Sequence, residues 1–456
     1  MGEEHQPDTR STTWRDWLLL GGVLALSILG VLLGLRWFAP QLLGVPTDLQ
    51  LVQTSETVPP FYEGVFRRDD IASRDYLLKD PRTVVRAHPL FPESRALGPN
   101  DILGFRNRDI PNVADVVVIG DSQTYGNNAR LEENWPSRLQ QSLNDKQARV
   151  YSMATGGWGG IQYLDMFDNA TLFQPGVVVV AFYSGNDALE AFRTAYGVDQ
   201  WKVLRLDPSL STSDLPKIEF PAPPSSYWTV EFEAGNKQIF TPELRLGANQ
   251  DIPAVNTGYR ILEEVARQIA NGAARSHIPL VLTVIPTKEL VYARKVEQAG
   301  LQAPLEYQAL INRESQSLSK LAEAFKAMPG ATYVDVLGAM QAAAMASQPL
   351  YFPDPDGHPA HTGYAVIAQA LAPAVDALLP PPPHGMVSVR ELDGKTRVYW
   401  ADAEGKRLVV RRDTLADNGW ETGAIPTVHA RALARLPYRG YFTDVDPSRY
   451  GPKSVR

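Results

Sequence analysis

The fold is decided by the stretch Asp115–Gly126, which reads DVVVIGDSQTYG. An unbroken run of β-branched residues predicts a strand that is buried on both faces, as strands are in parallel sheets. The run ends in Gly120, Asp121 and Ser122, so this strand delivers a serine to the loop at its carboxyl end. Open α/β sheets bind their ligands at that edge. We therefore expect an α/β fold with Ser122 in its site.

Two further polar blocks follow Ser122 in a fixed order. The block Tyr183–Asp187, which reads YSGND, comes directly after a second apolar run, Val177–Phe182. The block Asp356–His358, which reads DGH, precedes a helical segment. Strands and helices alternate between about residues 101 and 379, which predicts a doubly wound parallel sheet with helices on both faces.

The order of serine first, asparagine next and Asp/His last resembles that of the SGNH (GDSL-type) serine hydrolases. The resemblance covers roughly residues 100–378. It implies a three-layer α/β/α, flavodoxin-like fold and a nucleophilic Ser122 that is activated by a histidine. In that family the histidine lies five residues before a glycine, and His358 with Gly363 fits this spacing, whereas His361 does not.

The acid that orients His358 is less well defined by the pattern. Many members of the family carry Asp-x-x-His, but Pro355 stands three residues before His358. Asp356 matches the Asp-x-His form of the alginate O-acetyltransferase branch and is our preferred acid. Asp354 remains the alternative.

The resemblance also implies three donors to the oxyanion that forms during acyl transfer. These are the backbone N–H of Ser122, the backbone N–H of a glycine in the glycine-rich segment at residues 156–160, and the side-chain amide of Asn186. We assign the glycine to Gly157, which stands five positions after Ser152, and keep Gly156 as the alternative.

One more segment bears on the substrate. The stretch Val284–Tyr292, which reads VIPTKELVY, resembles a segment of alginate O-acetyltransferase-like proteins, which act on exported polysaccharide. The order of motifs differs, because the Asp-x-His of that branch precedes its serine. A role for Lys288 in merely capping the sheet explains the segment equally well.

Composition excludes several classes of function. The 456 residues carry a net charge of −7, so no basic field for nucleic acid exists. There are no cysteines, which excludes disulfides, thiolate metal sites and a cysteine nucleophile. We expect no cofactor and no metal. A zinc or iron site built from Asp354, Asp356, His358 and His361 is the rival interpretation, but proline and glycine interrupt that run.

The amino terminus predicts a membrane anchor. Residues 18–35 carry no charge and are just long enough to span a hydrocarbon core, with Trp14, Trp17 and Trp37 as interfacial anchors. We place a cytoplasmic tail at 1–16 and an uncleaved helix at 17–37. Arg10 and Arg15 precede the helix, so the positive-inside rule favours a single-pass protein of the inner membrane with its main domain on the periplasmic side.

The remaining boundaries follow from composition. We expect a stalk and lead-in at 38–100, a catalytic domain at 101–379 with an insertion at about 190–253, a proline-rich linker at 380–385 and a β-containing appendage at 386–456. The sequence as a whole predicts an extracytoplasmic serine esterase that acts on acyl, notably acetyl, esters of carbohydrate or envelope glycan, with envelope or polysaccharide-assembly proteins as partners. The alternatives are an O-acetyltransferase that modifies an exported polysaccharide and a non-catalytic glycan-binding protein on the same fold.

Overall fold

The computed structural model divides the chain into two units, Met1–Gly64 and Val65–Arg456. The residues that it describes are 14, 21–23, 26–27, 30–31 and 75–442, except 112, 144–147, 219–222, 234–235, 380–382, 391–394, 402–406, 418, 429–432, 434–435 and 437. Most of the expected anchor, and residues 38–74 of the expected stalk and lead-in at 38–100, therefore lie outside the described residues. Within the described part of the chain, no helix combines the length and the apolar character that a membrane span requires.

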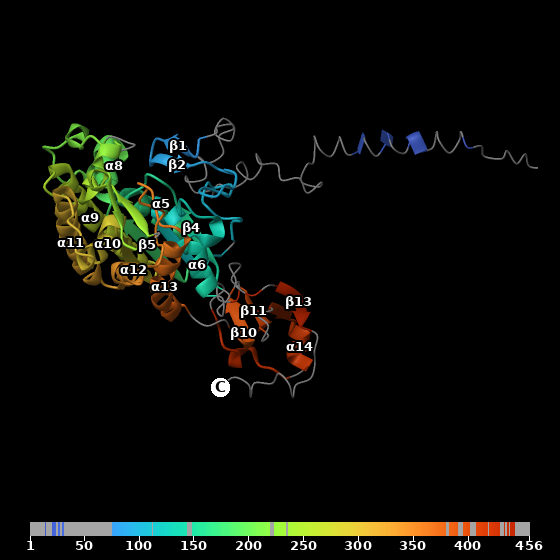
Figure 1. The fold of residues 1–456 in the computed structure, drawn as a ribbon. Coiled ribbons are helices and arrows are strands. Elements are labelled where there is room, and N and C mark those ends of the chain that lie inside the picture. Colours follow the sequence, from blue (N-terminus) through green and yellow to red (C-terminus); the bar gives the residue numbers. More distant parts are fainter. Residues whose placement is uncertain are drawn as a thin grey trace, which may run out of the picture. The chain divides into compact units, whose positions relative to one another are not determined.

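A five-stranded, all-parallel sheet lies at the centre of the second unit (Figure 1). Its strands are, in spatial order, β4 (Val150–Ala154), β3 (Val116–Gly120), β5 (Val177–Tyr183), β8 (Leu280–Ile285) and β9 (Ala331–Val334). Numbered along the chain, this order is 2-1-3-4-5, which is the flavodoxin-like order. The predicted α/β fold with a parallel sheet is confirmed.

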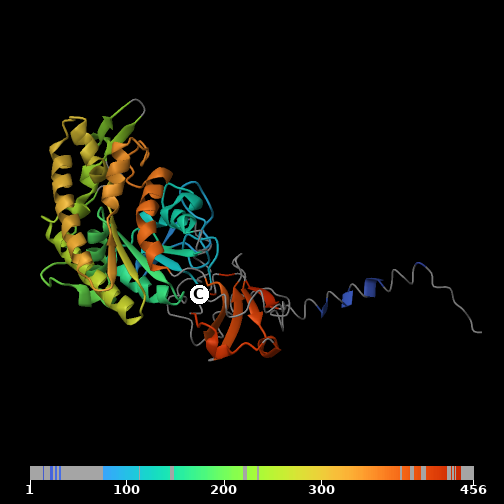
Figure 2. The same cartoon turned by 90° about the horizontal axis from the view of Figure 1, so that it is seen from below.

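Helices cover both faces of this sheet because the strands are apolar on both sides (Figure 2). Val116 and Val118 face one core, which also contains Trp135 and Leu371. Phe182 faces the other way, and its ring lies 5.3 Å from that of Tyr163 and 5.1 Å from that of Phe325, measured between centroids. The first face packs on α6 (Trp135–Ser142), α12 (Val336–Met345) and α13 (His361–Leu378), and the second on α7 (Gly160–Thr171), α9 (Pro253–Arg275) and α11 (Leu305–Lys326).

The structure corrects one predicted element. The sequence predicts a strand over Thr332–Leu337, but β9 ends at Val334 and α12 begins at Val336. Asp335 ends the strand because its carboxylate accepts a hydrogen bond from the backbone N–H of Leu337 at 2.9 Å and caps the helix. Two further short helices that the sequence analysis did not predict, α8 (Asp187–Gly197) and α10 (Lys288–Gln298), follow closely after strands β5 and β8.

The lead-in contains a hairpin that the sequence did not reveal. Strands β1 (Leu77–Asp80) and β2 (Val84–Ala87) pair antiparallel. The indole of Trp158, in the loop after β4, donates a hydrogen bond to the carbonyl of Val85 at 2.7 Å. The hairpin therefore packs against the glycine-rich loop that follows β4.

The insertion and the appendage are both built on hairpins. In the insertion, the sequence pattern predicts a hairpin of residues 227–232 with residues 238–240, and β6 (Trp228–Glu231) indeed pairs with β7 (Lys237–Phe240). In the appendage, β10 (Gly385–Arg390) pairs with β11 (Thr396–Ala401), also as predicted, although the turn Asp393–Gly394 lies outside the described residues. Strands β12 (Arg407–Val410) and β13 (Tyr438–Phe442) complete a four-stranded sheet, and α14 (Arg412–Asp417) follows β12.

Arg106 joins the lead-in to the loop that follows Ser122. Its side chain is only 1 % exposed, and its guanidinium donates to the carbonyls of Gly98, Gly126 and Ala129 at 2.7, 2.5 and 2.7 Å. Backbone carbonyls that lie in a protein interior need such donors, because water cannot reach them. One arginine thereby satisfies three carbonyls from two segments.

We predict that Arg106→Met lowers the free energy of unfolding by about 3 to 5 kcal/mol, because it leaves buried carbonyls without donors. Arg108→Met is the matched control: Arg108 forms an exposed ion pair with Glu132, for which a loss of about 1 kcal/mol or less is expected. Denaturant unfolding followed by tryptophan fluorescence measures both. Equal losses in the two variants would contradict this account of Arg106.

Candidate active site

Ser122 begins a single helical turn, α5 (Ser122–Tyr125), immediately after β3. The buried carboxylate of Asp121 caps this turn and accepts a hydrogen bond from the backbone N–H of Gln123 at 2.9 Å. Gly126 ends the turn with a φ of 87°, a conformation that favours glycine. The Ser122 side chain is thus fixed at the carboxyl edge of the sheet, where the sequence placed it.

His358 and Asp356 form a hydrogen-bonded chain with Ser122. The Nε2 atom of His358 lies 2.8 Å from Oγ of Ser122, and its Nδ1 atom lies 2.6 Å from Oδ1 of Asp356. An ionised carboxylate only accepts hydrogen bonds, so Nδ1 carries the proton and Nε2 is left to accept from the serine. This is the arrangement that a general base beside a serine requires.

The carboxylate of Asp356 is ionised. Its partial burial raises the pKa, but hydrogen bonds from His358 and from Nδ2 of Asn128, at 2.8 Å, outweigh burial and hold the pKa well below its usual value. A fixed negative charge next to Nδ1 stabilises the imidazolium that forms when His358 takes a proton.

Asp354 occupies a different position from Asp356. Its Oδ1 atom accepts a hydrogen bond from the backbone N–H of Asp356 at 3.0 Å, so it shapes the loop that carries the other carboxylate. His361 is exposed at the start of α13. Among the described residues, no group of three or more His, Cys, Asp and Glu side chains is arranged to hold a metal ion.

The three residues assigned as oxyanion donors follow three adjacent strands. Gly120 of β3 pairs with Ala154 of β4 and with Ala181 of β5, so these strands run in register to one edge of the sheet. Ser122, Gly157 and Asn186 come next along the chain after β3, β4 and β5. Parallel pairing therefore brings the three loops to the same edge.

Hydrogen bonding distinguishes Gly157 from Gly156, the alternative oxyanion donor. The backbone N–H of Gly156 donates to the hydroxyl of Tyr76 at 3.1 Å. The N–H of Gly157, whose φ is 74°, has no acceptor among the described residues. Gly157 rather than Gly156 is therefore available to a ligand. The amide of Asn186 is also unsatisfied within the described part of the chain, where its buried Oδ1 has no hydrogen-bond partner.

Asp121 and Asp187 are buried carboxyl groups that bind the backbone near Ser122 and Asn186. Burial raises the pKa of Asp121 to about 6, although the N–H of Gln123 and the nearby His358 lower it. Burial also raises the pKa of Asp187 well above its usual value. The Asp187 carboxylate accepts from the backbone N–H of Tyr183 at 2.9 Å, which fixes the loop that presents Asn186.

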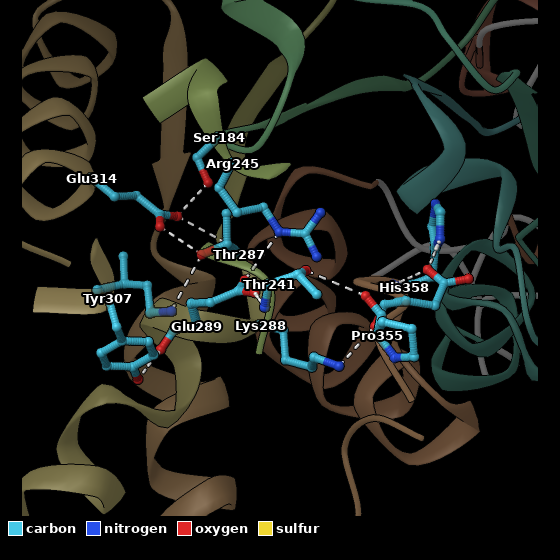
Figure 3. A network of polar contacts seen from close by, with 12 residues as sticks. Ser184, Thr241, Arg245, Thr287, Lys288, Glu289, Tyr307, Glu314, Pro355 and His358 are labelled. Atoms are coloured by element: carbon cyan, nitrogen blue, oxygen red, sulfur yellow. Dashed lines mark hydrogen bonds and ion pairs between the residues drawn. The ribbon is translucent and has the colours of Figure 1, made fainter. Parts of the chain in front are cut away.

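The sequence analysis missed most of a buried polar network behind the site (Figure 3). Its members are Ser184, Thr241, Arg245, Thr287, Glu289 and Glu314, together with Lys288. Glu314 accepts from the Ser184 hydroxyl at 2.6 Å and from the Thr287 backbone N–H at 2.9 Å, and burial raises its pKa to about 7. Of these residues, only Lys288 has a role suggested by the sequence, that of capping the sheet. Its side chain points instead to the loop of His358.

Comparison with known proteins gives a family for residues 118–366, which match the sequence model of the GDSL-like Lipase/Acylhydrolase family. That range includes Ser122, Gly157, Asn186 and the Asp356–His358 block. No protein of the curated set has a significantly similar sequence.

Several solved structures align with the chain. One is a putative lipolytic protein of the G-D-S-L family from Desulfitobacterium hafniense, with 15 % identity, a TM-score of 0.32 and coverage of 57 % of this chain and 97 % of that one. A psychrotrophic esterase from Pseudoalteromonas has 11 % identity, a TM-score of 0.30 and coverage of 58 % and 98 %. An acetylxylan esterase from Geobacillus stearothermophilus has 10 % identity, a TM-score of 0.32 and coverage of 58 % and 95 %.

Proposed function

Because the chain belongs to the GDSL-like lipase/acylhydrolase family, we propose that it is a serine esterase that forms an acyl-enzyme on Ser122. The observation that carries this proposal is the hydrogen-bonded chain from Ser122 through His358 to Asp356. A protein that only binds glycans has no need of a base beside a serine hydroxyl. Catalysis therefore explains this geometry better than binding alone does.

The geometry supports a two-step reaction. His358 Nε2 takes the proton of the Ser122 hydroxyl while Oγ attacks the ester carbonyl, and Asp356 stabilises the imidazolium. The tetrahedral intermediate collapses when His358 returns that proton to the leaving alcohol oxygen. Water or a sugar hydroxyl, whose proton His358 takes in the same way, then attacks the acyl-enzyme. The bond between the acyl group and Oγ of Ser122 breaks, and His358 returns the proton to Oγ.

Three donors stabilise the oxyanion in this proposal. They are the N–H groups of Ser122 and Gly157 and the Nδ2 amide of Asn186. The N–H groups of Ser122 and Gly157 have no backbone acceptor among the described residues, so each can donate to a developing negative charge without losing such a bond. Donors that are already in place cost little reorganisation in the transition state.

The substrate we propose is an acyl ester, notably an acetyl ester, of a carbohydrate or envelope glycan. The support is the likeness of the segment Val284–Tyr292 to alginate O-acetyltransferase-like proteins. That likeness equally favours transfer of the acyl group to a sugar hydroxyl of an exported polysaccharide. The two reactions share the acyl-enzyme and differ in the second acceptor, so mass spectrometry of acetylated oligosaccharide products separates them.

We also propose that residues 17–37 anchor the protein in the inner membrane, with the catalytic domain on the periplasmic side near envelope or polysaccharide-assembly proteins. The support is the uncharged run at 18–35 and the arginines before it. In spheroplasts, protease added outside should degrade the catalytic domain. Protection of that domain, in cells where a periplasmic control protein is degraded, would contradict this topology.

Ser122→Ala should abolish turnover of an activated acetyl ester and labelling by a fluorophosphonate, because no nucleophile remains. Asn186→Ala should lower kcat by about 10² to 10³, as expected for the loss of one oxyanion donor. Ser142→Ala, on the exposed end of α6, serves as the control and should leave kcat unchanged. Activity of Ser122→Ala close to that of the parent would exclude the covalent mechanism.

Asp356→Ala should lower kcat far more than Asp354→Ala, because only the Asp356 carboxylate contacts the imidazole of His358. We expect kcat to fall by about 10³ to 10⁴ in Asp356→Ala, because no carboxylate then holds the proton on Nδ1 of His358 or stabilises the imidazolium. The loss for Asp354→Ala should be about tenfold or less, since that residue only shapes the loop. Steady-state kinetics measure both, and the reverse order would assign the acid to Asp354.

A further inference from the structure

We infer that Lys288 is a positioning residue for the proposed reaction: its buried ammonium fixes the loop that carries Asp356 and His358. The inference rests on the proposed function, since it assigns how that site is assembled. Lys288 is fully buried, and its Nζ atom donates to the carbonyls of Asp354 and Asp356 at 2.7 and 2.8 Å. These two carbonyls flank Pro355, so one side chain holds both ends of the turn.

The position of Lys288 in the fold makes it a rigid support. It is the first residue of α10, and Thr287 caps that helix by accepting the backbone N–H of Leu290. Thr287 is itself held by Glu314, which also binds Ser184 at the end of β5. The buried carboxyl group of Glu314 therefore joins Ser184, which follows β5, to Thr287, which precedes Lys288 (Figure 3).

The loop itself has few other supports. Residues 354–358 form no helix or strand. The hydroxyl of Thr241 donates a long hydrogen bond, 3.4 Å, to the carbonyl of Pro355. Nδ2 of Asn128 donates to the carboxylate of Asp356. The two bonds from Lys288 are shorter than that from Thr241, and they come from the first residue of α10, a helix whose cap, Thr287, is held by Glu314. They are the principal bonds from the protein core to the backbone of this loop.

Charged groups of both signs lie near Lys288. Glu289, also fully buried, accepts from Nε of Arg245 at 3.1 Å, and the carboxylate of Asp356 lies on the loop that Lys288 binds. Burial lowers the pKa of Lys288 to about 8, although Glu289 opposes that shift. An apolar side chain of similar volume would avoid the desolvation of a cation. What the lysine adds is the placement of two carbonyls, and through them of His358.

Lys295 offers a matched control on the same helix. It is also buried, and its Nζ atom donates to Glu233 at 2.9 Å and to the hydroxyl of Ser347 at 2.8 Å. Lys295→Met therefore removes two lysine hydrogen bonds from α10, both to partners at the protein surface, without touching the loop of residues 354–358. Lys288→Met makes the same change and leaves Glu289 paired with Arg245.

We expect Lys288→Met to lower kcat by about 10²-fold, because a small displacement of a catalytic group has an effect of that size. KM should stay within about threefold of the parent value, since binding contacts are untouched. Lys295→Met should keep kcat within about threefold of the parent, with a loss of stability similar to that of Lys288→Met. A kcat of Lys288→Met within about threefold of the parent would overturn the inference.

A measurement that needs no substrate separates this inference from the proposed function. The Nδ1 proton of His358, hydrogen-bonded to Asp356 at 2.6 Å, should give a downfield ¹H NMR signal that is assigned by its loss in His358→Gln. The signal should persist in Lys295→Met and disappear or shift in Lys288→Met. An unchanged signal in Lys288→Met overturns the inference, whereas a parent without Ser122-dependent turnover overturns only the function. If Lys288→Met and Lys288→Gln both fail to fold while Lys295→Met folds, Lys288 is a stability residue and the inference also fails.

Discussion

Parallel pairing of β3 with β4 and β5 is the constraint on which the rest of the structure depends. The pairs of Gly120 with Ala154 and of Gly120 with Ala181 place the last residues of β3 and β4 beside Ala181, two residues before the end of β5. Whatever follows them in the chain must then emerge at one edge of the sheet. Ser122, the glycine-rich loop and Asn186 are far apart in sequence, and this register alone makes them neighbours in the fold.

His358, the proposed base, is not placed at this edge by strand pairing. His358 lies in a loop before α13, outside the sheet, and neither a strand end nor a helix cap fixes its backbone. Its place is set by side chains from elsewhere: Lys288 holds the carbonyls before it, and Asn128 holds the carboxylate of Asp356. Half of the site is thus positioned by backbone pairing and the other half by buried polar side chains.

This division explains what the sequence could and could not predict. Strand β3, its serine and the order of the polar blocks were readable because apolar runs and short motifs are local signals. Arg106, Glu314 and Asn128 were not readable, because a charged or amide side chain looks the same in sequence whether it is solvated or buried against a distant carbonyl. The helix α12 was partly misread as strand because the capping role of Asp335 competes with the apolar pattern around it.

The end of the insertion is part of the site rather than an attachment to it. A Cβ atom on Gly247 would lie 2.3 Å from the carbonyl oxygen of Gly185, next to Asn186, so the insertion packs directly on the asparagine loop. A Cβ atom on Gly357 would lie 2.4 Å from Nη2 of Arg245, so the same segment also packs on the histidine loop. Arg245 and Gly247 therefore bridge the loop that is proposed to bind the oxyanion and the loop that carries the base. A change in this segment of the insertion therefore alters the spacing of the two loops.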